Sequence, residues 1–60
     1  MTYNDAAKIE PGQVIIYDQG EGERRATVTG PVHEYRDWGY VVYVPIAGAM
    51  IVNTHILGVE

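Results

Sequence analysis

Four short apolar runs, each bounded by turn-forming residues, constrain the fold of this chain more than any other feature. The runs cover residues 14–17, 26–32, 40–44 and 50–52, and glycine, proline and charged residues lie between them. Runs of this length that are rich in β-branched and aromatic residues favour strands rather than helices. None approaches the roughly 20 apolar residues of a membrane-crossing helix. The pattern therefore predicts a small all-β domain.

The runs and the turns between them predict where each strand begins and ends. We expect strands over residues 13–18, 25–32, 39–44 and 50–53, with residues 33–38 as a loop and Pro45 ending the third strand. A single 3₁₀-like turn that starts at Asn53 or Thr54 and runs through Leu57 then leads to a very short fifth strand that begins at Val59. This order predicts a five-stranded barrel with a 3₁₀ turn before its last strand.

Residues 1–10 differ from the rest of the chain and form a predicted N-terminal extension, followed by a barrel domain over residues 11–60. Asn4 or Asp5 is a suitable N-cap for one helical turn over residues 6–9. One turn is unstable by itself because helix nucleation is costly. The extension is therefore expected either to pack on the barrel through Tyr3 and Ile9 or to fray.

The length of the chain limits how it can be stabilised. A domain of 60 residues buries only roughly 60% of its unfolded surface, so small domains often depend on disulfides, metals or partners. The chain has no cysteine, which excludes disulfides and fits a cytoplasmic location. His33 and His55 are its only nitrogen ligands for zinc, so we expect no metal site and no cofactor. Binding to a protein partner or to further copies of the same chain is the remaining common way to stabilise such a small domain.

The charge balance restricts the classes of partner. The net charge is −4, with four basic and eight acidic residues. Nucleic-acid binding and attachment to anionic membranes both depend on basic surfaces. We therefore expect no direct nucleic-acid binding and no membrane association. The start of the chain lacks the basic and apolar regions of a signal peptide.

An aromatic segment between the second and third predicted strands is the leading candidate for partner binding. Aromatic and arginine side chains supply most of the binding energy in many protein interfaces. The candidate contact residues are Tyr35, Arg36, Trp38 and Tyr43. The alternative is structural, with Trp38 closing one end of the barrel and Tyr40 in the core.

A second candidate surface comes from strands that are apolar on both faces. Ile15, Tyr17 and Val41, together with Tyr43, would form an apolar patch if they lay on the outside of the barrel. Such a patch indicates self-association or another interface. The alternative is that the N-terminal extension covers it.

The chain lacks a recognisable catalytic set. It contains neither cysteine nor serine as a nucleophile, and its carboxylates are scattered. His33 and His55 could act as general bases in principle, but histidines in small barrels more often make hydrogen bonds in loops. We therefore expect a protein that is not an enzyme.

From Gly12 onward the order of features resembles an SH3-like barrel, and its layout is similar to that of the plasmid-borne type II dihydrofolate reductases. The matching segments are residues 12–14, 26–30, 38–42 and 50–57. The resemblance implies the fold and self-association. In that family, a Val-Gln-Ile-Tyr strand lines the catalytic pore of a tetramer. Here Ile51 replaces the glutamine and Asn53 replaces the tyrosine, which argues against reductase activity.

Together these features predict a non-enzymatic SH3-like module that binds a protein. The small acidic chain is typical of phage or plasmid accessory proteins that act on a host protein. Two alternatives remain open. One is an oligomeric, reductase-like barrel with a ligand-binding pore, and the other is a module associated with the transcription or translation machinery.

Overall fold

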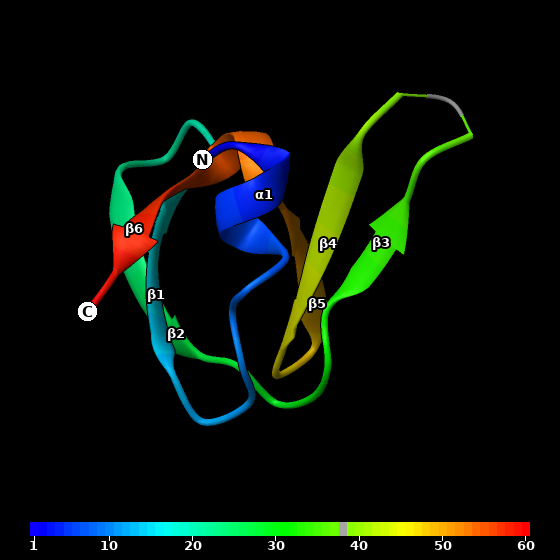
Figure 1. The fold of residues 1–60 in the computed structure, drawn as a ribbon. Coiled ribbons are helices and arrows are strands. Elements are labelled where there is room, and N and C mark those ends of the chain that lie inside the picture. Colours follow the sequence, from blue (N-terminus) through cyan, green and yellow to red (C-terminus); the bar gives the residue numbers. More distant parts are fainter. Residues whose placement is uncertain (38) are drawn as a thin grey trace.

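The computed structural model describes residues 1–37 and 39–60, and it is mostly β-structure (Figure 1). Its elements, in chain order, are α1 (Tyr3–Ala6), β1 (Val14–Asp18), β2 (Glu23–Thr27), β3 (His33–Tyr35), β4 (Val41–Ile46), β5 (Ala49–Val52), a 3₁₀ turn (Asn53–His55) and β6 (Ile56–Val59). The all-β class is therefore confirmed. The described chain has six strands where the sequence predicted five.

The strands form two antiparallel sheets of three strands each, in the orders β2–β1–β6 and β3–β4–β5. Within the described residues no strand of one sheet is paired with a strand of the other, so strand pairing does not close the sheets into the predicted five-stranded barrel. One backbone hydrogen bond, 3.0 Å from the Thr29 nitrogen to the Pro45 oxygen, connects the segment after β2 to β4. The two sheets are thus linked but remain distinct.

The predicted second strand, residues 25–32, is divided in the structure. Its first part belongs to β2, and the β1 ladder continues to Val28, whose nitrogen donates to the Gln13 oxygen at 2.8 Å. Pairing stops at Gly30-Pro31, because proline has no N–H to donate to a ladder. The chain then turns into β3, so residues 33–35 form a strand where a loop was predicted.

Pro45 lies inside β4 and does not end it, contrary to the prediction. β3 pairs with β4 only as far as Tyr43, so Pro45 faces an edge without a ladder on that side. Its carbonyl oxygen accepts the hydrogen bond from Thr29 there. A proline is tolerated in a strand where its missing N–H has no partner to lose. After β4, Gly48 takes the positive φ of 76° in the tight turn to β5.

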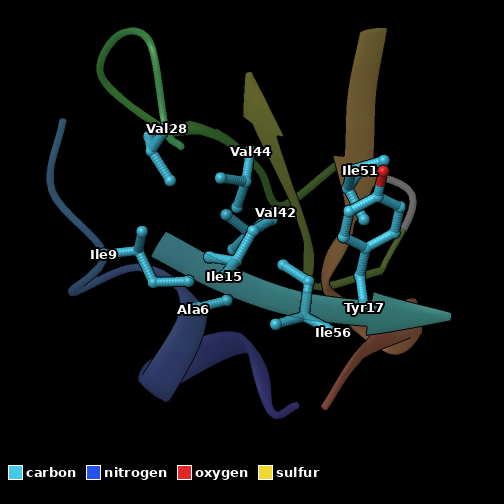
Figure 2. Packing of buried hydrophobic residues seen from close by; sticks show 9 residues of the cluster. All are labelled: Ala6, Ile9, Ile15, Tyr17, Val28, Val42, Val44, Ile51 and Ile56. Atoms are coloured by element: carbon cyan, nitrogen blue, oxygen red, sulfur yellow. The ribbon is translucent and has the colours of Figure 1, made fainter. Parts of the chain in front are cut away.

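The N-terminal segment packs between the two sheets. Its cap is Thr2, whose hydroxyl oxygen accepts from the Asp5 nitrogen at 3.2 Å, and not Asn4 or Asp5 as predicted. Ala6 and Ile9 are buried in the core. Figure 2 shows them beside the side chains that both sheets contribute; the cluster is Ala6, Ile9, Ile15, Tyr17, Val28, Val42, Val44, Ile51 and Ile56.

Asn53 is the one polar side chain buried within the described chain, and it begins the 3₁₀ turn. Its Oδ1 accepts from the Val42 nitrogen at 3.0 Å, and its Nδ2 donates to the Met1 oxygen at 2.9 Å. The predicted 3₁₀ turn is present and starts at Asn53, one of the two expected positions. It ends at His55 and not at Leu57, so β6 begins at Ile56 instead of Val59. Asn53 joins β4, the turn and the N-terminal segment.

Candidate functional site

The candidate site is the outer face of the β3–β4–β5 sheet. Residues directly opposite each other on paired strands share a face, and Val42, Val44 and Ile51 point inward to the core. The alternate residues therefore point outward. We call this surface the tyrosine face; it consists of His33, Tyr35, Val41, Tyr43, Pro45, Met50 and Val52. Figure 1 shows α1 and the β2–β1–β6 sheet on the opposite side.

The large side chains of the tyrosine face are open to solvent. Tyr35, Tyr43 and Met50 are 53%, 39% and 43% exposed, and Val41 and Val52 beside them are half-buried. The rings of Tyr35 and Tyr43 meet edge to face, with centroids 5.7 Å apart and planes at 81°. This geometry is favourable for aromatic pairs and holds the two rings in defined positions. The face is thus aromatic, exposed and ordered by its own contacts.

The tyrosine face carries no Asp, Glu, Lys or Arg. The outer face of the β2–β1–β6 sheet is different, because Asp18, Glu23 and Arg25 all point outward there. Arg25 forms ion pairs with Glu23 at 3.2 Å and with Glu60 at 3.1 Å. The charged groups of this small protein are therefore absent from one of its two broad surfaces.

A polar cluster lies on the α1 side of the β3–β4 hairpin. The Tyr3 hydroxyl donates to Glu34 Oε1 at 2.6 Å and accepts from Arg36 Nε at 2.9 Å. The Tyr3 ring also meets the Tyr40 ring edge-on, with centroids 5.4 Å apart. The hydrogen bond to Tyr3, aided by the nearby Glu34 carboxylate, raises the pKa of the Arg36 guanidinium above its usual value. This cluster fastens the N-terminal segment to the hairpin.

The residues predicted to bind a partner separate into three groups. Tyr35 and Tyr43 lie together on the tyrosine face. Arg36 has partners within the chain, on the other side of the hairpin. Trp38 lies outside the described residues.

The residues predicted for self-association also separate. Val41 lies on the tyrosine face, opposite Tyr35. Ile15 and Tyr17 are 0% and 8% exposed and belong to the core, so their predicted outer placement is wrong. The physical reason is that β1 turns these residues toward α1 and the second sheet, while Val14 and Ile16 point outward beside charged neighbours.

Four members of the tyrosine face were not selected from the sequence: His33, Pro45, Met50 and Val52. Met50 and Val52 flank the buried Ile51, and this alternation in residues 50–52 was the available signal. Their position beside Tyr43 depends on the β4–β5 register, which pairs Tyr43 with Val52. His33 reaches the face because it pairs with Tyr43 from the other side.

Residues 50–53, which the sequence resemblance paired with the pore strand of the reductases, do not form a ligand-contacting surface as a whole. Ile51 and Asn53, which that resemblance placed at the family's glutamine and tyrosine, are 1% and 4% exposed. Across residues 1–37 and 39–60 the structure has no pocket, and no group of three or more potential ligands is placed to hold a metal ion. In the same part of the chain no helix has the length and hydropathy that a membrane crossing needs.

No known protein family, curated protein or solved structure matches the chain.

Proposed function

We propose that this protein is a non-enzymatic, SH3-like protein-binding module whose contact surface is the tyrosine face. The observation that carries the proposal is the exposure of Tyr35, Tyr43 and Met50 on one uncharged three-stranded surface. Contiguous exposed apolar surface is uncommon on small soluble proteins and usually marks an interaction site.

The chemistry of these side chains suits protein contact. A tyrosine ring buries a large area with few rotatable bonds, and its hydroxyl can still donate a hydrogen bond at the rim of an interface. At about 25 cal/mol per Å² of apolar area removed from water, even partial burial of two such rings and a methionine favours association. Tyr35 and Tyr43 are therefore the main contact residues of the proposal.

The support beneath the face is rigid, which lowers the entropy lost on binding. The central strand β4 alternates between the face and the core, where Val42 and Val44 are fully buried. The Val42 nitrogen is held by Asn53, and the ring of Tyr43 is held by Tyr35. The contact residues are thus fixed before a partner arrives.

The finer fold assignment, an SH3-like barrel, belongs to this proposal. Two linked three-stranded sheets with a 3₁₀ turn before the last strand support it.

Site-specific photo-crosslinking tests the proposed function. A benzophenone amino acid is placed at Met50 on the tyrosine face, with Thr27 on the outside of the other sheet as the control position, because both side chains are exposed. In cells of the source organism, we expect protein adducts from position 50 and few from position 27. Equal labelling from the two positions, or none from position 50, would contradict the proposal.

A further inference from the structure

We propose that the partner of the tyrosine face is a second copy of this chain, bound face to face. The inference rests on the proposed function and names its partner. Three properties of the molecule carry it: the distribution of charge, the position of Tyr43 within the sheet, and the size of the face.

The distribution of charge removes the main obstacle to pairing two identical acidic chains. Each copy carries a net charge of −4, from eight acidic and four basic side chains. None of these twelve groups (8 + 4) lies on the tyrosine face. Two copies can therefore bury this surface without desolvating a charge and with all like charges kept outside the contact.

The same observation disfavours a strongly charged partner. A basic protein would find its complementary carboxylates on the outside of the β2–β1–β6 sheet, at Asp18, Glu23 and Glu60. Docked on the tyrosine face, its cations would lose water and gain no ion pair. An uncharged aromatic surface is complementary to another surface of the same kind, and the chain itself supplies one.

The sheet order places Tyr43 near the centre of such a contact. β4 is the middle strand, and Tyr43 lies between His33 on β3 and Val52 on β5. In a two-fold symmetric pair, residues near the axis meet the same residues of the other copy. Tyr43 is therefore expected to approach the Tyr43 of the second copy, with Tyr35 and Met50 on either side.

The size of the face predicts a weak complex. The strands lie about 4.8 Å apart, and at about 3.4 Å per residue only the six-residue β4 is about 20 Å long, while β3 and β5 have three and four residues. The patch is therefore well below the roughly 800 Å² per partner of a standard interface. A dissociation constant in the range of about 10 µM to about 1 mM is therefore expected. The fraction of the protein present as dimer would then rise with protein concentration.

Sedimentation equilibrium of the full chain tests the inference, with protein from about 10 µM to about 1 mM. We expect a monomer–dimer equilibrium. Raising the ionic strength from about 0.1 to about 1 M shortens the electrostatic screening length from about 10 to about 3 Å. Because added salt screens the repulsion between two acidic copies, we expect the dimer to become stronger. A chain that remains monomeric throughout would overturn the inference, as would a dimer that dissociates in high salt.

Charge-swap variants locate the contact. Tyr43→Glu and Tyr43→Lys should each weaken association at least about tenfold, because like charges meet at the centre of the pair. An equimolar mixture of the two should associate more tightly than either alone. Thr27→Glu, the control on the other sheet, should leave association unchanged. A dimer that survives both Tyr43 variants, or a mixture no tighter than its parts, would overturn the face-to-face arrangement.

The inference and the proposed function can fail separately. Circular dichroism measures whether each variant folds. If a Tyr43 variant does not fold, Met50→Glu and Met50→Lys provide a second charge-swap pair at a more exposed position of the same face. Monomeric protein that still gives adducts with a different protein from position 50 overturns only the identity of the partner. Monomeric protein without adducts overturns both.

Discussion

The two sheets share one core but present opposite outer surfaces. On the outside of β2–β1–β6, Arg25 lies between Glu23 and Glu60, and the aliphatic side chains of Val14 and Ile16 lie on the same surface as these charges. On the outside of β3–β4–β5, the corresponding positions hold Tyr35 and Tyr43 and no formal charge.

The contrast shows that burial in the core explains only one side of each sheet. Charged outer residues such as Arg25 keep a small domain soluble, and exposed ion pairs of this kind add little stability. Exposed aromatic residues such as Tyr43 do not favour solubility, and the contact between the Tyr35 and Tyr43 rings adds only modest stability to the monomer. We therefore interpret their concentration on one sheet as support for the contact surface proposed above.

The largest expected effect distinguishes the two sides of a single strand. Ile51→Ala removes a fully buried side chain of β5 and should lower the free energy of unfolding by about 2–5 kcal/mol. Met50→Ala, one residue earlier on the exposed face, should lower it by less than about 1 kcal/mol. Urea denaturation measures both. A larger loss at Met50 than at Ile51 would reverse the assignment of inner and outer faces.

The next largest effect concerns the polar link beneath the tyrosine face. Asn53→Ala leaves the buried Val42 nitrogen and the Met1 oxygen without their partner, so the free energy of unfolding should fall by about 1–3 kcal/mol. Thr54→Ala, at an exposed position of the same turn, is the control and should be nearly neutral. If the two variants unfold at the same urea concentration, the link does not support the sheet.

A smaller effect measures the order of the tyrosine face itself. Tyr35→Ala, Tyr43→Ala and the double variant form a thermodynamic cycle, whose coupling energy should be about 0.5–1.5 kcal/mol for an edge-to-face pair. The unfolding measurements should be made on dilute protein, where association does not contribute. A coupling energy near zero would mean that the two rings are not held together in the free chain.

The smallest effect is expected on the charged sheet. Arg25→Gln removes exposed ion pairs with Glu23 and Glu60 and should change the free energy of unfolding by less than about 1 kcal/mol. The difference should shrink further as salt is added. A salt-independent loss of several kcal/mol would show that this surface is structural, which would remove the contrast between the two sheets.

The sequence could predict three of the strands closely, but it predicted a loop at β3 and did not show how the strands are arranged into sheets. Short apolar runs locate β1, β4 and β5 because strand propensity and turn residues act locally. The division of residues 25–32 could not be foreseen, since the hydrogen bond of Thr29 to Pro45 joins distant parts of the chain. For the same reason, Pro45 was expected to end a strand that it in fact occupies.

The candidate site was predicted in part. Tyr35 and Tyr43 were recognised by residue type, because exposed aromatic residues are typical of interfaces. Ile15 and Tyr17 were placed on the wrong side, since β1 is apolar on both faces and only the packing of α1 decides which face is inner. Asn53 gave no signal, because its role depends on two backbone groups from elsewhere in the chain.

The most direct test of the central contrast is a dilution series followed by backbone amide NMR. From about 1 mM to about 10 µM protein, we expect chemical shifts to change in β3, β4 and β5 and to remain constant in β2. Spectra that do not change with concentration, or changes centred on β2, would contradict the assignment of the tyrosine face as the surface through which this protein associates.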